Sequence, residues 1–214
     1  GAAMSFLEHC RYRNFDGVAL ICADFLSPAV REFLECDIPC VTVDCYETKH
    51  YSVMTNNDEA AAQLLDHVMR FGHRRIAYVC GRDSAIADIR LSSLRKACRA
   101  RALELPGEYI RFAYYNDLVS TAEATRQLLA LPRPPTCIFY PDDYACLGGI
   151  HELRAHGLRV PQDMSVVGFD GIQLSQVLEP RLTTYRQDMD AIGQNAVLML
   201  RDAIEKKDGA LPRQ

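Results

Sequence analysis

Two aspartates and one arginine stand close to the ends of predicted strands, where ligand-binding groups gather in parallel α/β sheets. Asp170 ends an apolar run that begins at Ser165, and Asp142 follows a second such run. Arg90 lies early in a predicted helix. The carboxyl ends of parallel strands share one edge of a sheet, and small ligands bind at that edge. A guanidinium there can hold a hydroxyl pair or a carboxylate through two hydrogen bonds.

Each of these residues also has a purely structural interpretation. Asp143 is expected to cap the following helix, where the helix dipole favours negative charge, which leaves Asp142 freer to face a ligand. Asp170 could be a turn residue before Gly171. Arg90 could belong to a solvated helix face, like the basic residues that follow it on the same helix. The residues alone leave these alternatives open.

The sequence offers no clear arrangement of residues that could catalyse a reaction. Six histidines are scattered along the chain, at positions 9, 50, 67, 73, 151 and 156. The sequence contains no P-loop, no Gly-x-Ser-x-Gly elbow and no His-Glu-x-x-His motif, and Gly81 after a strand is far short of a dinucleotide fingerprint. We therefore predict a binding protein rather than an enzyme, with no catalytic residues and no cofactor.

The composition is that of an ordinary globular protein. The chain has 214 residues, 49% of them hydrophobic and 24% charged, and its net charge of −4 offers no general attraction for nucleic acid. Residues 1–56 carry four basic groups against eight acidic ones, which is unlike a DNA-binding arm. No apolar run approaches the roughly 18 residues of a membrane span, so no membrane partner is expected.

The nine cysteines are predicted to be reduced and structural. Their number is odd and no Cys-x-x-Cys pair occurs, which argues against disulfides and against a zinc site. Cys22, Cys80 and Cys137 sit inside apolar runs, where cysteine behaves as a small buried hydrophobe. Reduced thiols in this number favour a cytoplasmic location.

Predicted strands and helices alternate along the chain. The predicted strands cover residues 18–22, 39–44, 75–80, 110–114, 136–140 and 165–168. The predicted helices cover residues 28–36, 57–71, 88–102, 121–131, 143–156 and 189–206. This alternation indicates an α/β fold with parallel sheets flanked by helices.

Several ordered motifs resemble the effector-binding core of the LacI/GalR family of transcription regulators. They are Phe71-Gly-His-Arg-Arg-Ile76, Arg90-Leu-Ser-Ser-Leu94, Phe139 to Gly148, Gly157-Leu-Arg-Val-Pro161, Ser165 to Asp170 and Leu182-Thr-Thr184. Three positions within these motifs depart from the family pattern: Leu94 replaces an aromatic residue, Asp142 replaces an asparagine, and Cys146 replaces an alanine. The resemblance covers nearly the whole chain.

The resemblance implies a two-lobed, periplasmic-binding-protein-like core with a small effector between the lobes. One lobe is expected to comprise residues 1–56 and 185–214, and the other residues 57–184. In the second lobe the family's polar ligand contacts fall on Arg90, Asp142 and Asp170, and Leu118 takes a place where relatives often have a stacking aromatic. The contacts implied on the rim of the first lobe are Ala23, Asp24, Phe25, Asp44 and Asn56.

The family's helix-turn-helix head, its opening strand and helix, and its closing strand are expected to be absent from this chain, which leaves the first lobe incomplete. What the resemblance implies is a repressor-like regulator, cytoplasmic and homodimeric, that contacts DNA only through such a head. The effector would be a sugar or a purine-like metabolite, and effector-driven lobe closure would alter operator affinity. The alternative is an exported or stand-alone sugar-binding protein of the same fold, against which the nine cysteines count.

Overall fold

The computed structural model describes residues 4–45, 49–82 and 84–206, and these fall into two compact units. Unit 1 comprises Gly1–Thr55, Ser84–Ile86 and Asp188–Gln214, and unit 2 comprises Asn56–Asp83 and Ala87–Gln187. Each unit has its own parallel sheet, and the predicted α/β fold class is confirmed.

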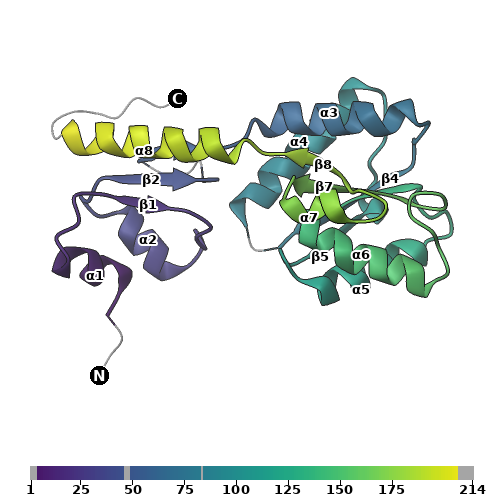
Figure 1. The fold of residues 1–214 in the computed structure, drawn as a ribbon, viewed down its shortest axis with the longest axis horizontal. Coiled ribbons are helices and arrows are strands. Elements are labelled where there is room, and N and C mark those ends of the chain that lie inside the picture. Colours follow the sequence, from purple (N-terminus) through teal and green to yellow (C-terminus); the bar gives the residue numbers. More distant parts are fainter. Residues whose placement is uncertain (1–3, 46–48, 83, 207–214) are drawn as a thin grey trace. The chain divides into compact units, whose positions relative to one another are not determined.

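Unit 1 is built on a three-stranded sheet in the order β1-β2-β3. The strands are β1 (Val18–Leu20), β2 (Cys40–Val43) and β3 (Tyr51–Val53), and both pairings are parallel. On one face of the sheet lie α1 (Phe6–Tyr12) and α2 (Pro28–Leu34), and on the other lies α8 (Met189–Glu205) (Figure 1).

The helix α1 corrects the expectation that the opening helix is absent. Ser5 and Glu8 form a capping box, in which each side chain accepts a hydrogen bond from the other's backbone N–H, so this short helix begins at a well-defined point. Its buried residues Leu7 and Cys10 pack against Phe33 of α2. The expectation of a missing closing strand concerns residues 207–214, which lie outside the described part of the chain.

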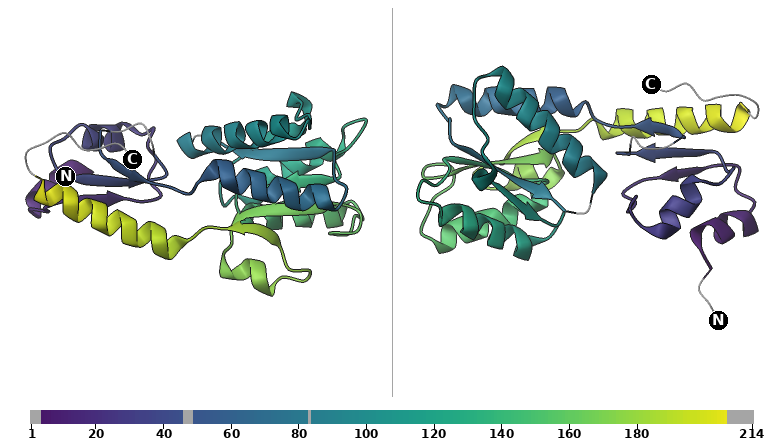
Figure 2. Two further views of the ribbon diagram at one scale, coloured as in Figure 1. Left: turned by 90° about the horizontal axis from the view of Figure 1, so that it is seen from above. Right: turned by 180° about the vertical axis from the view of Figure 1, so that it is seen from behind.

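Unit 2 is built on a five-stranded, all-parallel sheet in the order β5-β4-β6-β7-β8. Its strands are β4 (Ile76–Gly81), β5 (Ile110–Ala113), β6 (Cys137–Phe139), β7 (Ser165–Asp170) and β8 (Thr183–Arg186). Helices cover both faces of the sheet (Figure 2). They are α3 (Asn57–Arg70), α4 (Ala85–Ala100), α5 (Leu118–Leu129), α6 (Asp143–Ala155) and the short α7 (Gln173–Val177), with a 3-10 turn η1 at Gly107–Tyr109.

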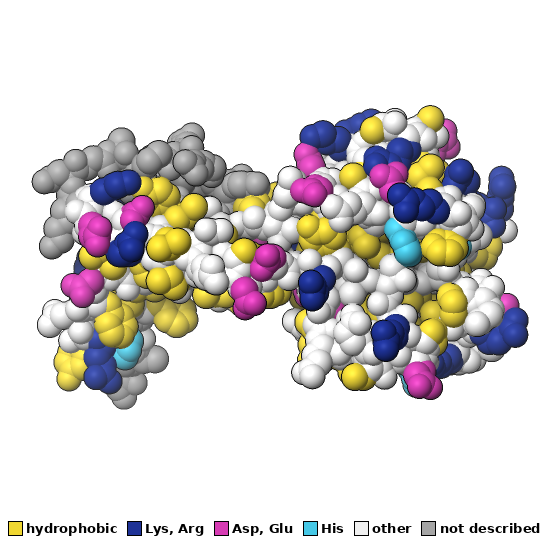
Figure 3. Space-filling model, turned by 45° about the horizontal axis from the view of Figure 1, so that its top comes forward, with side chains coloured by type: hydrophobic (Ala, Val, Ile, Leu, Met, Phe, Trp, Pro, Cys, Tyr) yellow, Lys and Arg dark blue, Asp and Glu magenta, His cyan; other side chains and the backbone are white. Residues whose placement is uncertain are grey.

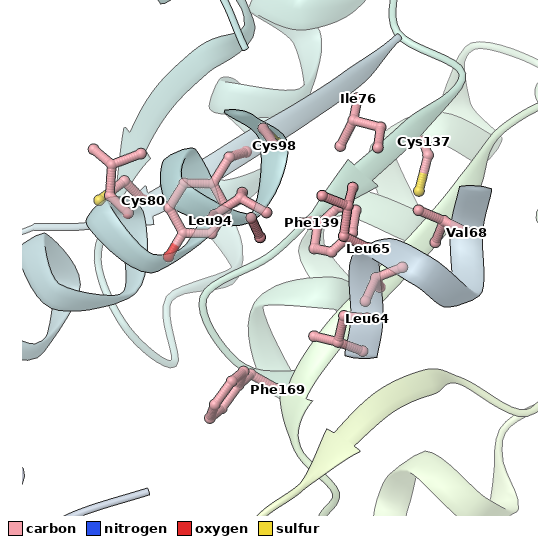
Figure 4. Close-up of a cluster of buried hydrophobic side chains, with 14 of the residues drawn as sticks. Leu64, Leu65, Val68, Ile76, Cys80, Leu94, Cys98, Cys137, Phe139 and Phe169 are labelled. Atoms are coloured by element: carbon pink, nitrogen blue, oxygen red, sulfur yellow. The ribbon is translucent and has the colours of Figure 1, made fainter. Parts of the chain in front are cut away.

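The interior strand β4 shows why the sequence predicts this layering. All six of its residues are buried, with Tyr78 and Cys80 facing α3 and α4 while Ala77 and Val79 face α5 and α6. Alternate side chains point to opposite faces, so a strand covered on both sides appears in the sequence as an unbroken apolar run. Figure 4 shows the first of these two cores, where Leu65 of α3 and Phe139 of β6 lie together.

Several element boundaries differ from the prediction. The strand predicted at 18–22 ends at Leu20, because Cys22 has a positive φ of 53° and is exposed. The helix predicted from 121 begins at Leu118, because the Asp117 side chain accepts hydrogen bonds from the backbone of Val119 and Ser120. The strand predicted at 165–168 continues to Asp170. The strands β3 and β8 and the helix α7 were not predicted.

Eight of the nine cysteines are buried, and Cys22 is the exception. Burial raises the pKa of Cys40 and Cys137 to about 12 and that of Cys80 and Cys98 to about 11. These thiols are therefore uncharged packing groups at neutral pH. The prediction that Cys22 is a buried strand residue was wrong.

None of the helices in the described residues is both long enough and apolar enough to span a bilayer.

Candidate functional site

Arg90 is a buried residue of α4, with 8% of its surface exposed. Its guanidinium carbon lies 3.8 Å from the centre of the Phe169 ring, and its Nη1 donates a hydrogen bond of 3.0 Å to the carbonyl of Pro141. The Phe169 ring in turn stacks on Tyr185. Arg90 therefore does not lie on a solvated face of the helix, which was the alternative interpretation from the sequence. Arg95, on the same helix, is exposed and does lie on such a face.

The stacked guanidinium keeps unused hydrogen-bonding capacity. Its Nε atom is buried and has no hydrogen-bond partner in the described part of the chain. Leaving a buried donor unpaired is costly, so native structures rarely do so unless a ligand or an ordered water completes the site.

Asp170 ends β7 beside this arginine. Its Oδ1 lies 4.0 Å from Nη2 of Arg90 and accepts a hydrogen bond of 2.7 Å from Nε2 of Gln187. Burial raises the pKa of Asp170 to about 6, although the charge of Arg90 and the hydrogen bond from Gln187 act in the opposite direction.

The backbone at Asp170 is strained, and the side chain is held in place by its neighbours. Its φ is +105°, outside the regions that residues with a Cβ normally adopt. The residue is part of the strand rather than of a free turn, because its carbonyl also accepts a hydrogen bond of 3.1 Å from the backbone of Gln187. Strained backbone that the surrounding structure enforces is a feature of ligand-binding sites.

The adjacent carboxylates do not have the roles expected of them. Asp142, not Asp143, caps α6: its Oδ1 accepts from the backbone of Ala145 at 2.7 Å, and its Oδ2 accepts from the backbone of Asn116 at 3.0 Å. Asp143 lies in the first turn of α6, and its Oδ2 accepts from the backbone of Ile172 at 2.9 Å. Burial raises the pKa of Asp143. Both carboxylates therefore tie loops at the carboxyl edge of the sheet to α6.

Tyr115 is a site residue that the sequence reasoning missed. Its hydroxyl is buried without a hydrogen-bond partner among the residues described, and its ring lies so close to Gly81 that a Cβ there would collide with it. Burial raises the pKa of Tyr115 to about 12, and the charges of Arg90 and Asp170 are near enough to act on it. The signal in the sequence was an aromatic residue shortly after a predicted strand.

The other predicted site residues lie at strand ends or helix starts within their own units. Asn56 of unit 2 caps α3 by accepting from the backbone of Glu59 at 3.2 Å, and Leu118 is an exposed residue at the start of α5. In unit 1, Asp44 follows β2 with a positive φ of 62°. After β1, the Oδ1 atom of Asp24 accepts from the backbone of Leu26, and Phe25 packs half-buried against the α1–α2 core. Ala23 packs against the same core.

The structure brings the predicted residues of the second lobe together. Arg90, Asp142 and Asp170 all lie at the carboxyl edge of the sheet of unit 2, joined through Pro141 and the Arg90–Asp170 pair. The side chains of Arg90 and Asp170 are paired there, whereas the carboxylate of Asp142 faces the backbone amides of Ala145 and Asn116. The described residues contain no cluster of His, Cys, Asp or Glu suited to a metal ion. The fold and this edge define a small-molecule-binding α/β domain of the periplasmic-binding-protein type.

Comparisons with known proteins agree with this class. Residues 65–214 match the family of periplasmic binding protein-like domains. The HTH-type transcriptional repressor CytR of Escherichia coli K12 is 33% identical over 155 residues, which cover 72% of this chain and 45% of the repressor. The repressor PurR of Vibrio cholerae serotype O1 is 29% identical over 201 residues, covering 92% of this chain and 59% of the repressor. The chain therefore spans about half the length of these curated relatives.

Solved structures match over nearly the whole chain. A complex of the transcriptional regulator CelR with cellobiose has a TM-score of 0.85 and 27% identity, over 98% of this chain and 67% of that one. A Lac repressor dimer bound to operator and the anti-inducer ONPF has a TM-score of 0.81 and 25% identity, over 94% of this chain and 70% of that one. The chain thus belongs to the periplasmic binding protein-like domain family, as an effector-binding core of LacI type. The predicted family resemblance is confirmed.

Proposed function

We propose that this chain binds a small, uncharged effector, a sugar or a purine-like metabolite, through Arg90 and Asp170. The observation that carries the proposal is the Arg90–Asp170 pair. Arg90 is buried and Asp170 is half-buried, Phe169 and Gln187 hold the two side chains in place, and the Nε atom of Arg90 has no hydrogen-bond partner among the described residues. The unpartnered hydroxyl of Tyr115 adds a further group for the effector.

The charges at this edge suit a neutral ligand. The guanidinium of Arg90 and the carboxylate of Asp170 lie 4.0 Å apart and largely compensate each other. A hydroxyl can donate to the carboxylate and accept from the guanidinium, whereas a charged ligand would leave one member of the pair repelled in a poorly solvated place. Asp142 was expected to contact the effector, but both of its carboxylate oxygens accept from the backbone amides of Ala145 and Asn116, so we propose that it holds these two segments in place. Asp24, Phe25, Asp44, Asn56 and Leu118 remain proposed contacts because they match positions of the family pattern.

In the whole protein, we propose, effector binding shifts the equilibrium between two conformations and changes the affinity for an operator. The relatives are HTH-type repressors, which favours a cytoplasmic homodimeric regulator without enzymatic activity over an exported sugar-binding protein. Contact with DNA would come from a helix-turn-helix segment outside this chain. The lobe closure expected from the resemblance is part of this proposal.

A thermal-shift screen of neutral sugars, nucleosides and nucleobases tests the proposed function. A ligand at about a hundred times its dissociation constant stabilises the protein by about 2.7 kcal/mol, which raises Tm by several degrees in a domain of this size. Titration calorimetry of the hit then compares the natural chain with Arg90→Lys and Asp170→Asn. Arg95→Gln is the matched control, because Arg95 lies on the same helix and is exposed.

We expect both site variants to weaken effector binding by about tenfold or more, because each loses a hydrogen bond to a charged group, while Arg95→Gln binds normally. Circular dichroism establishes that each variant is folded before binding is compared. Unchanged isotherms in folded Arg90→Lys and Asp170→Asn would refute the assignment of the site.

A further inference from the structure

Asp143 is the most deeply buried acidic side chain in the described part of the chain, with 1% of its surface exposed. Most charged side chains of unit 2 lie at the surface, and Figure 3 shows Arg, Lys, Asp and Glu side chains spread over one face of it. Burying a carboxylate costs free energy unless its contacts compensate. The contacts that Asp143 makes therefore indicate its role.

Strand β7 makes room for this carboxylate at Gly168. A Cβ atom on Gly168 would lie 2.2 Å from Oδ1 of Asp143 and 3.2 Å from Sγ of Cys146. The φ angle of Gly168 is not positive, so its backbone conformation does not require glycine. Space is the reason for the glycine, because a side chain there would push Asp143 away from β7.

From this position Asp143 holds the turn that follows Asp170. Its Oδ2 atom accepts a hydrogen bond of 2.9 Å from the backbone N–H of Ile172. The backbone N–H of Gly171 donates to Oγ1 of Thr184 at 3.3 Å. The first two backbone N–H groups after Asp170 are thus both bound, one to α6 and the other to β8.

The turn needs to be held because Asp170 is strained. Its φ of +105° costs free energy, and such a conformation persists only where the surrounding structure enforces it. Gln187 binds the carbonyl and the Oδ1 atom of Asp170, and Asp143 binds the chain two residues further on. Without the second anchor, the strain relaxes by rotation of the backbone at Asp170, which turns the carboxylate away from Arg90.

We infer that Asp143 is a positioning residue of the effector site: by binding the backbone N–H of Ile172, it keeps the carboxylate of Asp170 next to Arg90. Its importance for effector binding rests on the proposed function, whereas its effect on the Arg90–Asp170 pair does not. Burial raises the pKa of Asp143, and hydrogen bonds from Thr184 and from the backbone of the turn act in the opposite direction. The contacts that hold the turn thus also compensate part of the cost of burying the carboxylate.

Three variants separate the holding of the turn from other contributions of Asp143. Asp143→Ala removes the acceptor for the Ile172 N–H, whereas Asp143→Asn keeps one. Gly168→Ala retains Asp143 but fills the space of its carboxylate, so it breaks the same contact by another route. Asp163→Ala is the matched control, because Asp163 also accepts from a backbone N–H, that of Arg159 at 2.9 Å, but is exposed and precedes β7.

The deciding measurements need no effector. Carboxyl-carbon NMR of the full chain gives the titration midpoint of Asp170, whose pKa burial raises to about 6. We expect Asp143→Ala and Gly168→Ala to lower this midpoint by about one unit or more, because the released carboxylate becomes solvated. Hydrogen exchange at Nε of Arg90 should become about tenfold faster. Asp143→Asn should keep most of both values, and Asp163→Ala should change neither. Calorimetry with a sugar or nucleoside found by thermal shift should then show about tenfold weaker binding to Asp143→Ala.

Two results would overturn the inference. If folded Asp143→Ala is less stable but keeps the Asp170 midpoint near 6, Asp143 supports only the fold. If Asp143→Asn and Asp143→Ala lower the midpoint equally, the charge of Asp143 acts on Asp170, because both variants remove that charge and only one removes the acceptor. Should Asp143→Ala fail to fold by circular dichroism, an unchanged midpoint in Gly168→Ala decides against the inference. Failure to find any effector would count against the proposed function alone, since these midpoints are measured without one.

Discussion

The raised pKa of Asp170 makes the stability of unit 2 depend on pH in a predictable direction. Burial raises this pKa from its ordinary value of 3.8 to about 6. A carboxyl group that holds its proton more tightly in the folded state than in the unfolded state favours folding when it is protonated. The contribution of Asp170 to the free energy of unfolding is therefore fully present below about pH 4 and is lost as the pH rises through about 6.

The magnitude follows from the same two values. A difference of one pKa unit corresponds to about 1.4 kcal/mol. The free energy of unfolding therefore falls by about 3 kcal/mol in total as the pH rises from below about 4 to well above about 6. Between about pH 5 and pH 8 the expected loss is about 1.4 kcal/mol, because at pH 5 the native carboxyl is mostly protonated and the unfolded one is mostly ionised. The side chain of Asp170 is 25% exposed, so screening by solvent does not remove the effect.

The matched comparison is the natural chain against Asp170→Asn, an almost isosteric change that removes the titration. Asparagine also tolerates positive φ better than most residues do, which matters at a backbone φ of +105°. Urea unfolding at several pH values gives the free energy of unfolding of each protein, and the difference between the two proteins cancels the titration of independent groups. Carboxyl-carbon NMR gives the midpoint of Asp170 directly.

We expect the free-energy difference between variant and natural chain to change by about 1.4 kcal/mol from pH 5 to pH 8, in favour of the variant at the higher pH. A difference that stays constant across this range, or a carboxyl midpoint near 4, would show that Asp170 is solvated. The account of the Arg90–Asp170 pair as a poorly hydrated site would then fail.

Three further perturbations test other parts of the structure. Gly81→Ala should cost about 1–3 kcal/mol by thermal denaturation and should weaken effector binding, because the new Cβ collides with the ring of Tyr115; equal Tm values would contradict this packing. Asp142→Ala should lower the free energy of unfolding in urea by about 2 kcal/mol, because it removes the cap of α6 and the acceptor for the Asn116 N–H; Asp142→Asn keeps the capping oxygen but turns an NH2 group towards the Asn116 N–H, so it should cost about 1 kcal/mol, and equal stability of all three proteins would contradict these contacts. Cys22 should be the thiol that reacts quickly with an aromatic disulfide reagent, and Cys22→Ser should abolish this rapid phase; several rapid equivalents would mean that the buried thiols are accessible.

Much of the fold is encoded locally and was predicted. Strands buried on both faces, such as β4, are continuous apolar runs, and helices such as α3 repeat apolar residues at helical spacing. The alternation of the two determines a parallel α/β arrangement. The position of Asp170 at the carboxyl end of a strand also followed from the sequence alone.

Short edge strands were beyond sequence reasoning. β3 and β8 have three and four residues, with mostly half-buried side chains, and neither has an apolar run. Their backbone is ordered by hydrogen bonds to β2 and β7, which the local sequence does not specify. The helix α1, by contrast, could have been predicted, because the Ser5–Glu8 capping box at its start is visible in the sequence.

The chemistry of the site was decided by contacts between distant segments. Asp142 and Asp143 are adjacent aspartates, so the local sequence does not distinguish them. Their roles differ because the backbone N–H of Asn116 donates to Asp142 and that of Ile172 donates to Asp143.

What the sequence determined by itself was the succession of strands and helices and the edge at which charged side chains gather, because periodicity and burial pattern are local properties of the chain. What the tertiary structure decided was the burial, the contacts and the pKa of each charged side chain at that edge. Arg90 and Arg95 share a helix, yet Arg90 is buried against Phe169 and Pro141 while Arg95 is exposed. Desolvation, stacking and pKa depend on which residues are neighbours in space, and the folding of distant segments brings those neighbours together.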